Sequence, residues 1–450
     1  DADSDTGTVY FNLSVNDNFV ASYTQTSIAN GSSVSWIVDP NNWTRNDNLS
    51  FWAEAFDETE LSGKNTTNIT VSNTLPNVDS LTLNATTFAN ITSDNLTAYV
   101  TTSDNDGDDV KVIYNWLKDS TSISVLNMPF EKINNTDTNN AHDYSGYGND
   151  GTVTDATWNA TGGYDGKGAY EFDGIDDYVS VNDHDSLEMR THDLTVEAWI
   201  KTTTLATTSV FVNKRSNASY EWGGYSVALT DSGESITCSE NFDQSGFSIS
   251  SNQNVNDGNW HHVACVYDRD DKLFLYFDGD QIDSIDISSK SSIDQDLSEP
   301  LVIGMRKTNS RLDLPFNGTI DEVKVYDKTL SADQIYALYQ NRTDEIVSAE
   351  TTAGENWTVI AYPNNGYEDG ASVMSNNVTI LAGNTAPYML APTLNVTTVY
   401  NPTWVNVSVI YSDADSDTGT VYFNLSVNDN FVASYSQSSI SNGSSVSWSV

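Results

Sequence analysis

The first 38 residues of this chain return almost unchanged at its other end. Residues 1–38 and 413–450 are identical at 34 of 38 positions, at an offset of 412 residues. Near-identity over this length predicts that a unit of about 412 residues is repeated in tandem in a longer protein. A tether, filament or surface coat gains length and multivalency from such repetition, whereas an enzyme seldom needs it. The alternative is a single local duplication of one domain.

The charge balance excludes some classes of partner. The 450 residues include 63 acidic and 19 basic side chains, which gives a formal net charge of -44. Binding to nucleic acid or to anionic membranes requires clustered Lys and Arg, so neither is expected. Hydrophobic residues make up 38% of the chain, enough to bury real cores and to argue against a disordered acidic tail. No apolar run approaches the roughly 18 residues of a membrane span.

Turn-rich segments divide the chain into domains. Asn-Thr-Leu-Pro at 73–76 and Asn-Thr-Ala-Pro at 384–387 each follow a strand-like run and mark boundaries. Continued across the repeat offset, the segment from 384 has about 102 residues, the size of an immunoglobulin-like sandwich. The chain therefore holds this sandwich as two partial copies, residues 1–73 and 384–450. In the first copy Val9, Phe11, Leu13 and Val15 alternate with polar residues, as a half-buried strand requires.

A second sandwich is predicted to be interrupted by an insertion. The stretch from 74 to 383 is too long for one sandwich, but without residues 128–343 its two flanks, 74–127 and 344–383, total about 100 residues. Tyr-Asn-Trp at 114–116 and Glu-Asn-Trp-Thr-Val at 355–359 resemble the immunoglobulin-like and PKD-type modules of prokaryotic, particularly archaeal, surface proteins. We therefore expect tandem sandwiches on an extracellular cell surface.

The inserted segment carries many short strand-like runs and one helix signal. Ser331 and Gln334 have the spacing of a helix capping box, and Leu330 can pack against Ile335. Several motifs occur in order: Asp-Tyr-Ser-Gly-Tyr-Gly-Asn-Asp-Gly at 143–151, Tyr-Glu-Phe-Asp-Gly-Ile-Asp-Asp-Tyr-Val at 170–179, Asn-Trp-His-His-Val-Ala at 259–264 and Gly-Thr-Ile-Asp-Glu-Val-Lys-Val-Tyr at 318–326. This set resembles the laminin-G-like, concanavalin A-like jelly-roll family. The predicted fold class is all-β, with immunoglobulin-like sandwiches in tandem and an inserted concanavalin A-like jelly roll.

Calcium is the expected cofactor, because hard cations bind several oxygens and the chain has dense Asp loops. The family resemblance implies a structural calcium, and within the jelly roll the candidate ligands are Asp143, Asp173, Asp176, Asp321 and Glu322. For Asp143 and Asp173, the alternative is a turn capped by the Asp side chain.

A second set of candidate calcium ligands belongs to the sandwiches, namely Asp104, Asp106, Asp108, Asp413, Asp415 and Asp417. These loops do not have EF-hand spacing. A solvated polar turn is the alternative to a metal site there.

Exported proteins carry two further kinds of covalent feature that this sequence allows. Asn-x-Ser/Thr glycosylation signals occur mostly in the sandwiches, and the candidates are Asn12, Asn30, Asn42, Asn48, Asn65, Asn68, Asn84, Asn90, Asn95, Asn377, Asn395, Asn406 and Asn424. Cys238 and Cys265 are the only cysteines, and they can form one disulfide or remain as buried thiols. The pair His261-His262 is read as structural, since adjacent strand residues point to opposite faces.

No catalytic site is expected. Glycoside hydrolysis needs two carboxyl groups roughly 5 to 9.5 Å apart, whereas Asp321 and Glu322 are neighbours on one strand and should diverge. The predicted function is a non-catalytic tandem-repeat protein of a cell surface, filament or sheath, stabilised by calcium, glycosylated, and associating with other copies of itself. The alternative is an adhesin whose jelly roll binds surface glycans in a calcium-dependent way.

Overall fold

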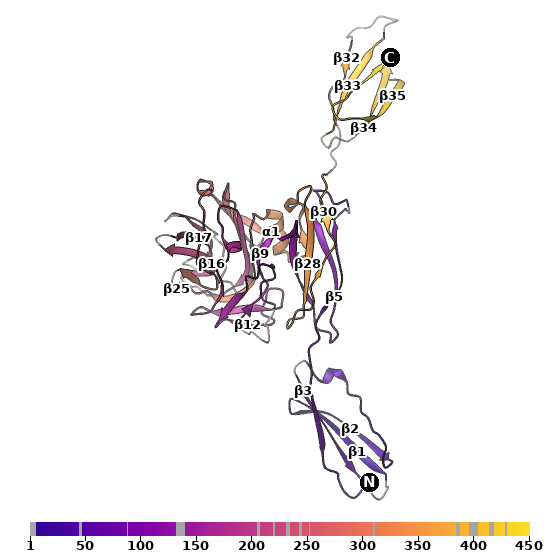
Figure 1. Ribbon diagram of the computed structural model, residues 1–450, viewed down its shortest axis with the longest axis vertical. Helices are drawn as coiled ribbons and strands as arrows, with labels where there is room; N and C mark the ends of the chain where they lie inside the picture. The colour runs from indigo at the N-terminus through magenta and orange to yellow at the C-terminus, as the bar shows by residue number, and fades with distance from the viewer. Residues whose placement is uncertain are drawn as a thin grey trace. The chain divides into compact units, whose positions relative to one another are not determined.

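The chain forms two compact units (Figure 1). One comprises Asp1–Asn77, Thr102–Lys111 and Pro363–Ala371, and the other comprises Val78–Thr101, Val112–Tyr362 and Ser372–Val450. The computed structural model describes residues 6–44, 47–87, 89–131, 140–204, 208–218, 221–230, 235–242, 245–251, 253–308, 311–383, 388–395, 404–413, 418–427 and 430–450. Strands dominate both units, which confirms the all-β prediction. Among the described helices, not one has the length and apolarity that crossing a membrane requires.

The first unit contains one antiparallel sheet in the order β2-β1-β3-β4. Its strands are β1 (Gly7–Val15), β2 (Asn18–Ile28), β3 (Asn48–Phe56) and β4 (Asn65–Thr70), with the short 3-10 helix η1 (Pro40–Asn42) before β3. Leu13, Val15 and Leu49 form its buried centre. This unit also includes residues 102–111 and 363–371, which the sequence assigned to the second sandwich. Within it, the Asn365 amide donates to the Thr74 carbonyl (3.0 Å) and to Asp104 (3.1 Å).

The inserted segment folds into two eight-stranded antiparallel sheets. The first runs in the order β10 (Asn140–Ala141), β11 (Gly151–Thr154), β14 (Tyr178–Val181), β23 (Leu301–Ile303), β16 (Ser209–Ala218), β17 (Glu221–Leu229), β18 (Ile236–Phe242) and β19 (Ser245–Ser250). The second runs β12 (Thr157–Asn159), β13 (Ala169–Asp173), β26 (Asn317–Tyr326), β15 (Leu194–Lys201), β20 (Trp260–Tyr267), β21 (Lys272–Phe277) and β22 (Asp280–Asp286), with β9 (Ser124–Met128) beside β26. A small hairpin, β24 (Arg306–Thr308) and β25 (Arg311–Asp313), and the 3-10 helices η2 (Asp185–Leu187) and η3 (Ser288–Lys290) complete it.

The core of this jelly roll is built from the inner faces of both sheets. Val212 and Val227 of the first sheet and Val196 and Val263 of the second belong to one buried apolar cluster. A disulfide joins Cys238 in β18 to Cys265 in β20, and so ties the two sheets together across the core.

The predicted helix signal is confirmed with one change. Helix α1 spans Ala332–Tyr339, and the Ser331 side chain accepts a hydrogen bond from the Gln334 N–H (3.2 Å) as an N-cap. The Gln334 side chain does not complete a capping box. Instead it donates to the Glu345 carbonyl (3.1 Å) and accepts from the Val347 N–H (2.9 Å), so it ties the helix to the segment that follows.

Segments on both sides of the jelly roll contribute strands to the same sheets. One sheet has the order β27 (Glu345–Ile346), β6 (Leu96–Ser103), β5 (Asn77–Ala85), and the other has the order β29 (Val373–Met374), β28 (Asn356–Asn364), β7 (Lys111–Lys118), β8 (Thr121–Ser122), with β30 (Val378–Thr379) beside β28. The 3-10 helix η4 (Ser348–Glu350) connects the return segment to β28. Because these pairings join residues more than 200 positions apart in sequence, such as Asp119 and Asn356, the sandwich closes only across the jelly roll.

The jelly roll and this sandwich share an apolar core. One buried cluster contains Trp116 and Trp357 of the sandwich, Ala264 and Tyr326 of the jelly roll, and Ile335 of α1. Helix α1 lies between the second jelly-roll sheet and β28 (Figure 1), where it contributes to this cluster. The jelly roll is therefore fixed to the sandwich that it interrupts.

Residues 388–450 form a cluster of strands with its own buried apolar centre. Its strands are β31 (Tyr388–Met389), β32 (Thr393–Leu394), β33 (Asn406–Ser412), β34 (Gly419–Val427), β35 (Asn430–Ile440) and β36 (Ser445–Ser449). Strands β31, β32 and β36 pair with β33, and β34 pairs with β35. The β34–β35 hairpin has the same register and the same two irregularities as the β1–β2 hairpin, as the repeat predicts.

Candidate functional site

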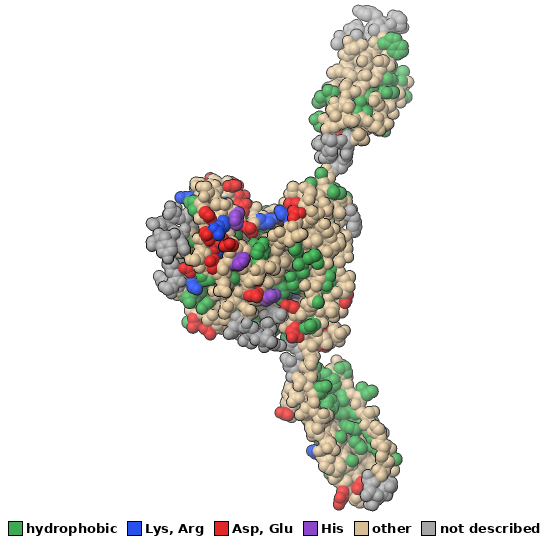
Figure 2. Space-filling model, viewed as in Figure 1, with side chains coloured by type: hydrophobic (Ala, Val, Ile, Leu, Met, Phe, Trp, Pro, Cys, Tyr) green, Lys and Arg blue, Asp and Glu red, His purple; other side chains and the backbone are tan. Residues whose placement is uncertain are grey.

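Acidic side chains gather at three places where they could share a cation. Within the described residues these groups are Glu131–Asp165–Glu322 and Asp173–Asp176–Asp177 in the jelly roll, and Asp104–Asp106–Asp108 in the first unit. In each group, one carboxylate oxygen from every residue lies within 4.8 Å of the others. On the face shown in Figure 2, acidic and basic side chains lie close together on the jelly roll.

The Glu131–Asp165–Glu322 group lies where β26 meets a loop that contains Gly163 and Gly168. Glu131 and Glu322 are buried, and Asp165 is half-buried. Backbone N–H groups of this loop orient two of the carboxylates: the Gly168 N–H donates to Glu131 (3.0 Å), and the Lys167 N–H donates to Asp165 (2.9 Å). This geometry fixes three carboxylates from distant parts of the chain around one point.

Asp321 and Glu322 do not diverge as the sequence led us to expect. Glu322 has a left-handed backbone (φ 49°), opposite an irregularity between Glu197 and Trp199 of β15. A bulge of this kind re-aims a side chain out of the strand alternation. Asp321 accepts a hydrogen bond from the Tyr164 N–H (3.0 Å) while Glu322 approaches Asp165. Both carboxylates therefore face the same loop, and this explains why both are buried.

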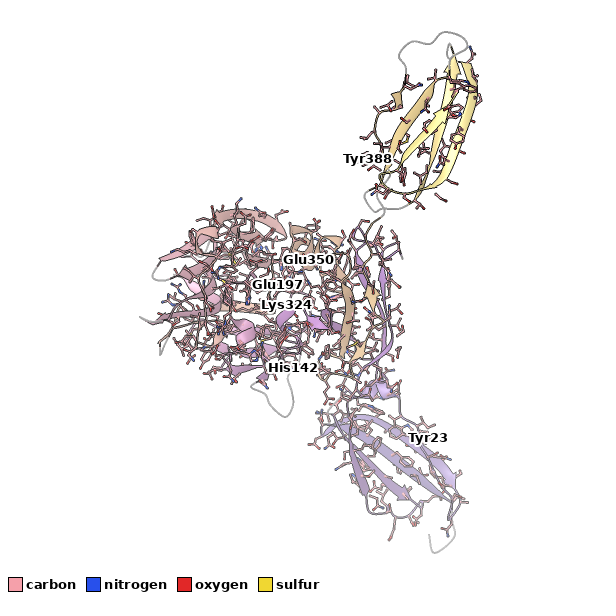
Figure 3. All side chains as sticks on the ribbon, turned by 45° about the horizontal axis from the view of Figure 1, so that its top comes forward. Tyr23, His142, Glu197, Lys324, Glu350 and Tyr388 are labelled. Atoms are coloured by element: carbon pink, nitrogen blue, oxygen red, sulfur yellow. A yellow bond between two sulfur atoms is a disulfide. The ribbon has the colours of Figure 1, made fainter. Side chains whose placement is uncertain are left out.

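A network of buried charges lies beside this group. Lys324 Nζ is 2.7 Å from Glu322 and 3.6 Å from Glu197, and Figure 3 shows Glu197 and Lys324 close together in the interior. The Tyr326 hydroxyl donates to Glu197 (3.0 Å), and His262 Nε2 lies 3.2 Å from the same carboxylate. Burial opposes ionisation of Glu197, but Lys324 and His262 keep its pKa below the ordinary value. Glu197 therefore belongs to a buried network with Lys324, His262 and Tyr326.

The two adjacent histidines point to opposite faces, as predicted. His262 faces the buried Glu197, whereas His261 lies 2.9 Å from Asp278 and 3.2 Å from Asp257. Each ring has a carboxylate partner that orients it, so both histidines act as structural residues.

The second jelly-roll group adds Asp177 to the predicted pair of Asp173 and Asp176. The Asp177 carboxylate accepts a hydrogen bond from the Asp173 N–H (2.7 Å), and the Asp173 carboxylate accepts one from the Ile175 N–H (2.8 Å). Asp173 therefore also caps a turn, which was the alternative to a metal-binding role. Burial, followed by repulsion from Asp173 and Asp176, raises the pKa of Asp177. Asp173 and Asp176 are exposed, and this group is the more open of the two.

The third group, Asp104–Asp106–Asp108, lies in the first unit and is hydrogen-bonded to Thr74, the residue at which the second sandwich was predicted to begin. The Thr74 N–H donates to Asp106 (2.9 Å), and its hydroxyl also hydrogen-bonds Asp106. Hydrogen bonding with Asp104 and then with Thr74 lowers the pKa of Asp106 to about 2. Thr74 and Asn365 therefore already satisfy part of this loop with protein donors.

Among the described residues, Asp143 and Asp413 do not belong to any of these acidic groups. The Asp143 carboxylate accepts backbone N–H groups of Asn127, Ser145 and Asn149, each at 2.9 Å, and the Ser145 hydroxyl at 2.6 Å. This is the turn-capping alternative, and it leaves little capacity for a metal. Asp413 is buried, and its N–H donates to Asn442 (3.0 Å). Asp415 and Asp417 lie outside the described residues.

The Glu131–Asp165–Glu322 group could hold a calcium ion. Calcium binds oxygens at about 2.3–2.6 Å, so two of its ligands lie no more than about 5 Å apart, and the 4.8 Å limit satisfies this. All three donors are hard carboxylate oxygens, and their mutual repulsion favours a divalent cation. Lys324 neutralises one charge through its contact with Glu322.

Aromatic rings lie next to this acidic group. Tyr164, which precedes Asp165, stacks on Trp199 with ring centroids 3.9 Å apart and an interplanar angle of 7°. Tyr339 of α1 extends the stack at 5.8 Å from Trp199, and Tyr336, which is 46% exposed, lies 6.1 Å from Tyr339. We call Tyr164, Trp199, Tyr336 and Tyr339 the aromatic strip. Trp199 is itself buried, so the accessible part of the strip is made by its three tyrosines, which carry hydroxyl groups.

The predicted glycosylation sites are all at least partly accessible. Asn30, Asn48, Asn65, Asn68, Asn377, Asn395 and Asn424 are exposed, and Asn12, Asn42, Asn84, Asn90, Asn95 and Asn406 are half-buried. Asn95 is the least suitable of them, because its amide donates to Glu345 (2.5 Å) and its oxygen accepts the Ser348 N–H (2.8 Å). A glycan on that nitrogen would break the contact between β6 and the return segment.

Two packed antiparallel sheets, joined by a disulfide and followed by the capped helix α1, define the architecture of residues 140–339. Residues 172–336 match the concanavalin A-like lectin/glucanases superfamily. This lectin-type match covers most of the jelly roll and does not extend to the sandwiches. No curated protein matches the sequence.

Solved structures with a related architecture include two toxin binding domains. The chain is 16% identical to the binding domain of Paraclostridial Mosquitocidal Protein 1 (TM-score 0.40, covering 49% of this chain and 52% of that one) and 16% identical to the receptor binding domain of botulinum neurotoxin D (0.38, 49% and 53%). It thus spans about half the length of each. A complex of the botulinum neurotoxin serotype D ligand binding domain with N-acetylneuraminic acid is 13% identical (0.38, 67% and 73%).

Proposed function

We propose that the lectin-like jelly roll is a calcium-dependent carbohydrate-binding module and that the sandwiches carry it, so that the protein acts as a non-catalytic adhesin. The observation that carries this proposal is the aromatic strip beside the Glu131–Asp165–Glu322 group. The match to a lectin-type family model supports a binding role for this part of the chain.

The chemistry of sugars suits this combination of groups. A pyranose ring has apolar C–H faces that pack on aromatic rings, and a rim of hydroxyl groups that need hydrogen-bond partners. Binding sites for small ligands are commonly apolar and aromatic surfaces with a few fixed polar groups. In the strip, Tyr164 supplies a half-exposed ring and a hydroxyl group, while Asp165 brings a carboxylate to the next position.

Calcium belongs to the proposal as a cofactor held by Glu131, Asp165 and Glu322. When bound, it would supply a hard Lewis acid that can accept sugar hydroxyl oxygens as ligands. Because Asp321 holds the Tyr164 N–H, any shift of the 163–168 loop would move the Tyr164 ring as well. The cation and the aromatic platform are therefore expected to depend on each other.

The test is binding of the full chain to a panel of immobilised glycans with calcium and with a chelator. We expect saturable binding that is lost on chelation and that weakens at least about tenfold in Tyr164→Ala and in Glu131→Gln. Tyr99→Ala is the matched control, since Tyr99 is an exposed tyrosine on β6, far from the strip in sequence and outside the jelly roll. Glycan binding that is unaffected by both site variants would contradict the proposal, and so would the absence of binding to any glycan.

A structural role for the repeated sandwiches is the second candidate, and the reproduced hairpin favours it. Near-identical modules with identical strand register are what a tether or filament of tandem copies would contain. In this account the protein lies on an extracellular, archaeal-type cell surface, and the accessible Asn signals carry glycans. Electron microscopy of native material before and after calcium chelation tests it. Ordered filaments or sheets would support assembly, and isolated flexible strands in both conditions would count against it.

A further inference from the structure

One face of the four-stranded sheet in the first unit has an open aromatic hollow. Its volume is about 470 Å³, which lies within the range of about 300–1,000 Å³ that is common for ligand sites. Side chains of β1 and β3 and one residue that follows β3 line it, namely Tyr10, Asn12, Trp52, Glu54, Phe56 and Leu61. We call this surface the β1–β3 hollow.

The strand register places Asn12 inside the hollow. Asn12 lies directly opposite Trp52 in the ladder between β1 and β3, and side chains at opposite positions of an antiparallel pair have Cβ atoms about 4.5–5.5 Å apart. Tyr10 lies two residues earlier on β1, so its side chain projects from the same face of the sheet. Asn12 therefore has one aromatic neighbour across the sheet and another along its own strand.

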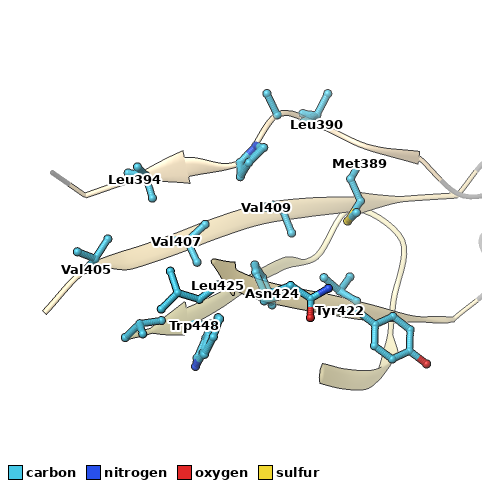
Figure 4. Close-up of a pocket in the computed structure, with 15 residues that line it drawn as sticks. Met389, Leu390, Leu394, Val405, Val407, Val409, Tyr422, Asn424, Leu425 and Trp448 are labelled. Atoms are coloured by element: carbon cyan, nitrogen blue, oxygen red, sulfur yellow. The ribbon is translucent and has the colours of Figure 1, made fainter. Parts of the chain in front are cut away.

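This face of the sheet is the outer face of the sandwich. The second copy includes strands of the opposing sheet, and there Val421 and Phe423 of β34 belong to the buried cluster that they share with β33 (Figure 4). Tyr422, which stands between them and points the other way, is 71% exposed. Because Tyr422 corresponds to Tyr10 at the repeat offset of 412 residues, the hollow faces away from the side on which the two sheets pack.

Neighbouring residues hold the aromatic side chains of the hollow. Lys64 Nζ lies 4.0 Å from the centroid of the Trp52 ring in a cation–π contact, and Lys64 does not line the hollow. Phe56, four residues further along β3, is joined to Leu61 by an isolated backbone bridge. Trp52 itself is half-buried, so part of its ring remains accessible. The hollow thus offers a flat apolar surface, with the Glu54 carboxylate beside it as a hydrogen-bond acceptor.

The Asn12 amide is suited to modification. The sequence Asn-Leu-Ser at 12–14 is an N-glycosylation signal. Asn12 is half-buried, and among the described residues its side chain has no hydrogen-bond partner. Asn95 differs in this respect, because its amide donates to Glu345. A sugar on the Asn12 nitrogen would therefore break no contact of the fold.

We propose that Asn12 carries an N-linked glycan whose first sugar packs on Trp52 and Tyr10 in the β1–β3 hollow. The apolar C–H groups of the sugar would face the rings, while its hydroxyl groups would remain toward solvent and Glu54. Covalent attachment inside the hollow keeps the sugar at a high local concentration, so docking needs little affinity of its own. For this reason the occupant is the protein's own glycan rather than a free saccharide.

This inference rests on the glycosylation proposed above for the sandwiches and is independent of glycan binding by the jelly roll. It assigns one of the signals to a built surface, where the sugar becomes part of the packing of the module. A docked sugar would also cover an aromatic patch that otherwise faces solvent.

The first test uses native material. Glycopeptide mass spectrometry determines whether Asn12 is occupied, and hydroxyl-radical footprinting then measures the oxidation rate of Trp52 before and after enzymatic removal of the glycans. We expect Asn12 to be occupied and Trp52 to be oxidised about threefold faster after removal, because an aromatic contact favours the docked sugar by about fivefold. Trp260 is the reference, since it is a half-buried tryptophan on β20 with Lys201 near its ring; its oxidation rate should not change.

A pair of variants, made in a host that attaches the same glycans, identifies the sugar. Asn12→Gln should expose Trp52 to oxidation as much as removal of all glycans does. Asn68→Gln is the matched control, because Asn68 is a glycosylation signal on the same face of the sheet, opposite Ser50, and does not line the hollow. It should leave the oxidation rate of Trp52 unchanged.

A second pair of variants identifies the platform. Trp52→Ala should speed enzymatic release of the Asn12 glycan from the native fold by about fivefold, because the sugar loses its aromatic contact. Tyr23→Ala is the matched control, since Tyr23 lies opposite Phe11 on the other face of the same sheet, and it should leave the rate unchanged. Hydrogen exchange in β1 and β3 checks that both variants remain folded.

Three results would overturn the proposal. They are an unmodified Asn12 in native material, an oxidation rate of Trp52 that is the same before and after glycan removal, and an equal effect of Asn68→Gln and Asn12→Gln. If Asn12 is unmodified while other sandwich sites are occupied, only this inference fails. If no site is occupied, the proposed glycosylation of the sandwiches fails with it.

Discussion

Removing the disulfide should destabilise the jelly roll without unfolding it. Cys238 and Cys265 are fully buried, lie 27 positions apart, and have Cα atoms separated by 5.8 Å. One belongs to each of the two packed sheets, so their bond restricts the unfolded chain and also fills the centre of the core. The double variant Cys238→Ala, Cys265→Ala removes both contributions.

The size of the effect follows from loop length and packing. Closing a loop of 27 residues lowers the entropy of the unfolded chain enough to be worth about 3.5 kcal/mol. Loss of two buried sulfur atoms adds about 1 to 2 kcal/mol. We therefore expect the free energy of unfolding of the jelly roll to fall by about 5 kcal/mol, and its Tm by roughly 10–15 °C.

Hydrogen exchange with mass spectrometry on the full chain is the suitable assay, because it reports each domain separately where a single melting curve would mix them. Peptides from β18 and β20 should exchange much faster in the double variant, while peptides from β1 and β2 serve as an internal control. Incubating the unmodified chain with a thiol reductant under native conditions should change nothing, since both sulfur atoms are shielded. Unchanged exchange in β18 and β20 of the double variant would refute the reasoning.

Three further outcomes are expected. Burial raises the pKa of Glu240 to about 8 and that of Glu188 to about 7, although Arg269 and Lys214 act in the opposite direction. Because both pKa values exceed the ordinary 4.5, the folded jelly roll binds more protons than the unfolded chain, and its urea midpoint should fall as pH rises from 5 through 8. A rising midpoint would contradict this. Gly304→Ala should destabilise the jelly roll by about 2–4 kcal/mol in chemical denaturation, because Gly304 has φ +88° and a Cβ there would lie 2.3 Å from the Phe172 ring. An unchanged midpoint would show that the ring moves freely. Trp357→Ala should lower the free energy of unfolding by about 3–5 kcal/mol and speed hydrogen exchange in both β7 and β28, since Trp357 is fully buried. Faster exchange in β28 alone would argue against a shared core.

The features that the sequence predicted well are local or repeated. Alternation of apolar residues predicted the strand at 9–15, the Ser331 signal predicted the start of α1, and the repeat predicted that β34 and β35 reproduce β1 and β2. Each of these depends on residues close to one another in the chain. The turn at Asp143 was weighed between a metal ligand and a cap, and its four hydrogen bonds favour the cap.

The acidic site could be only partly predicted, because it is built from distant segments. Glu322 was a candidate, but Glu131 and Asp165 were not, since neither lies in a dense acidic run, and only the pairing of β13 with β26 brings their loop beside Glu322. The bulge that turns Glu322 toward that loop has no marker in the sequence, because left-handed backbone is unusual for glutamate. Asp177, by contrast, stands in the motif at 170–179 and could have been included from its spacing alone.

The interrupted sandwich has a consequence for the order of events on the ribosome. Strand β7 is complete at Lys118, but its partner β28 begins at Asn356 and is made after the whole jelly roll. At about 5–20 residues per second, β7 waits on the order of 10 to 50 seconds for that partner. During this time the apolar face of β7 and the outer face of the new jelly roll can be covered only by each other, by α1 and by the earlier strands β5 and β6, which contribute to the same cluster. Translation speed across the insertion is therefore expected to affect the yield of folded protein more than it would for a sandwich of continuous sequence.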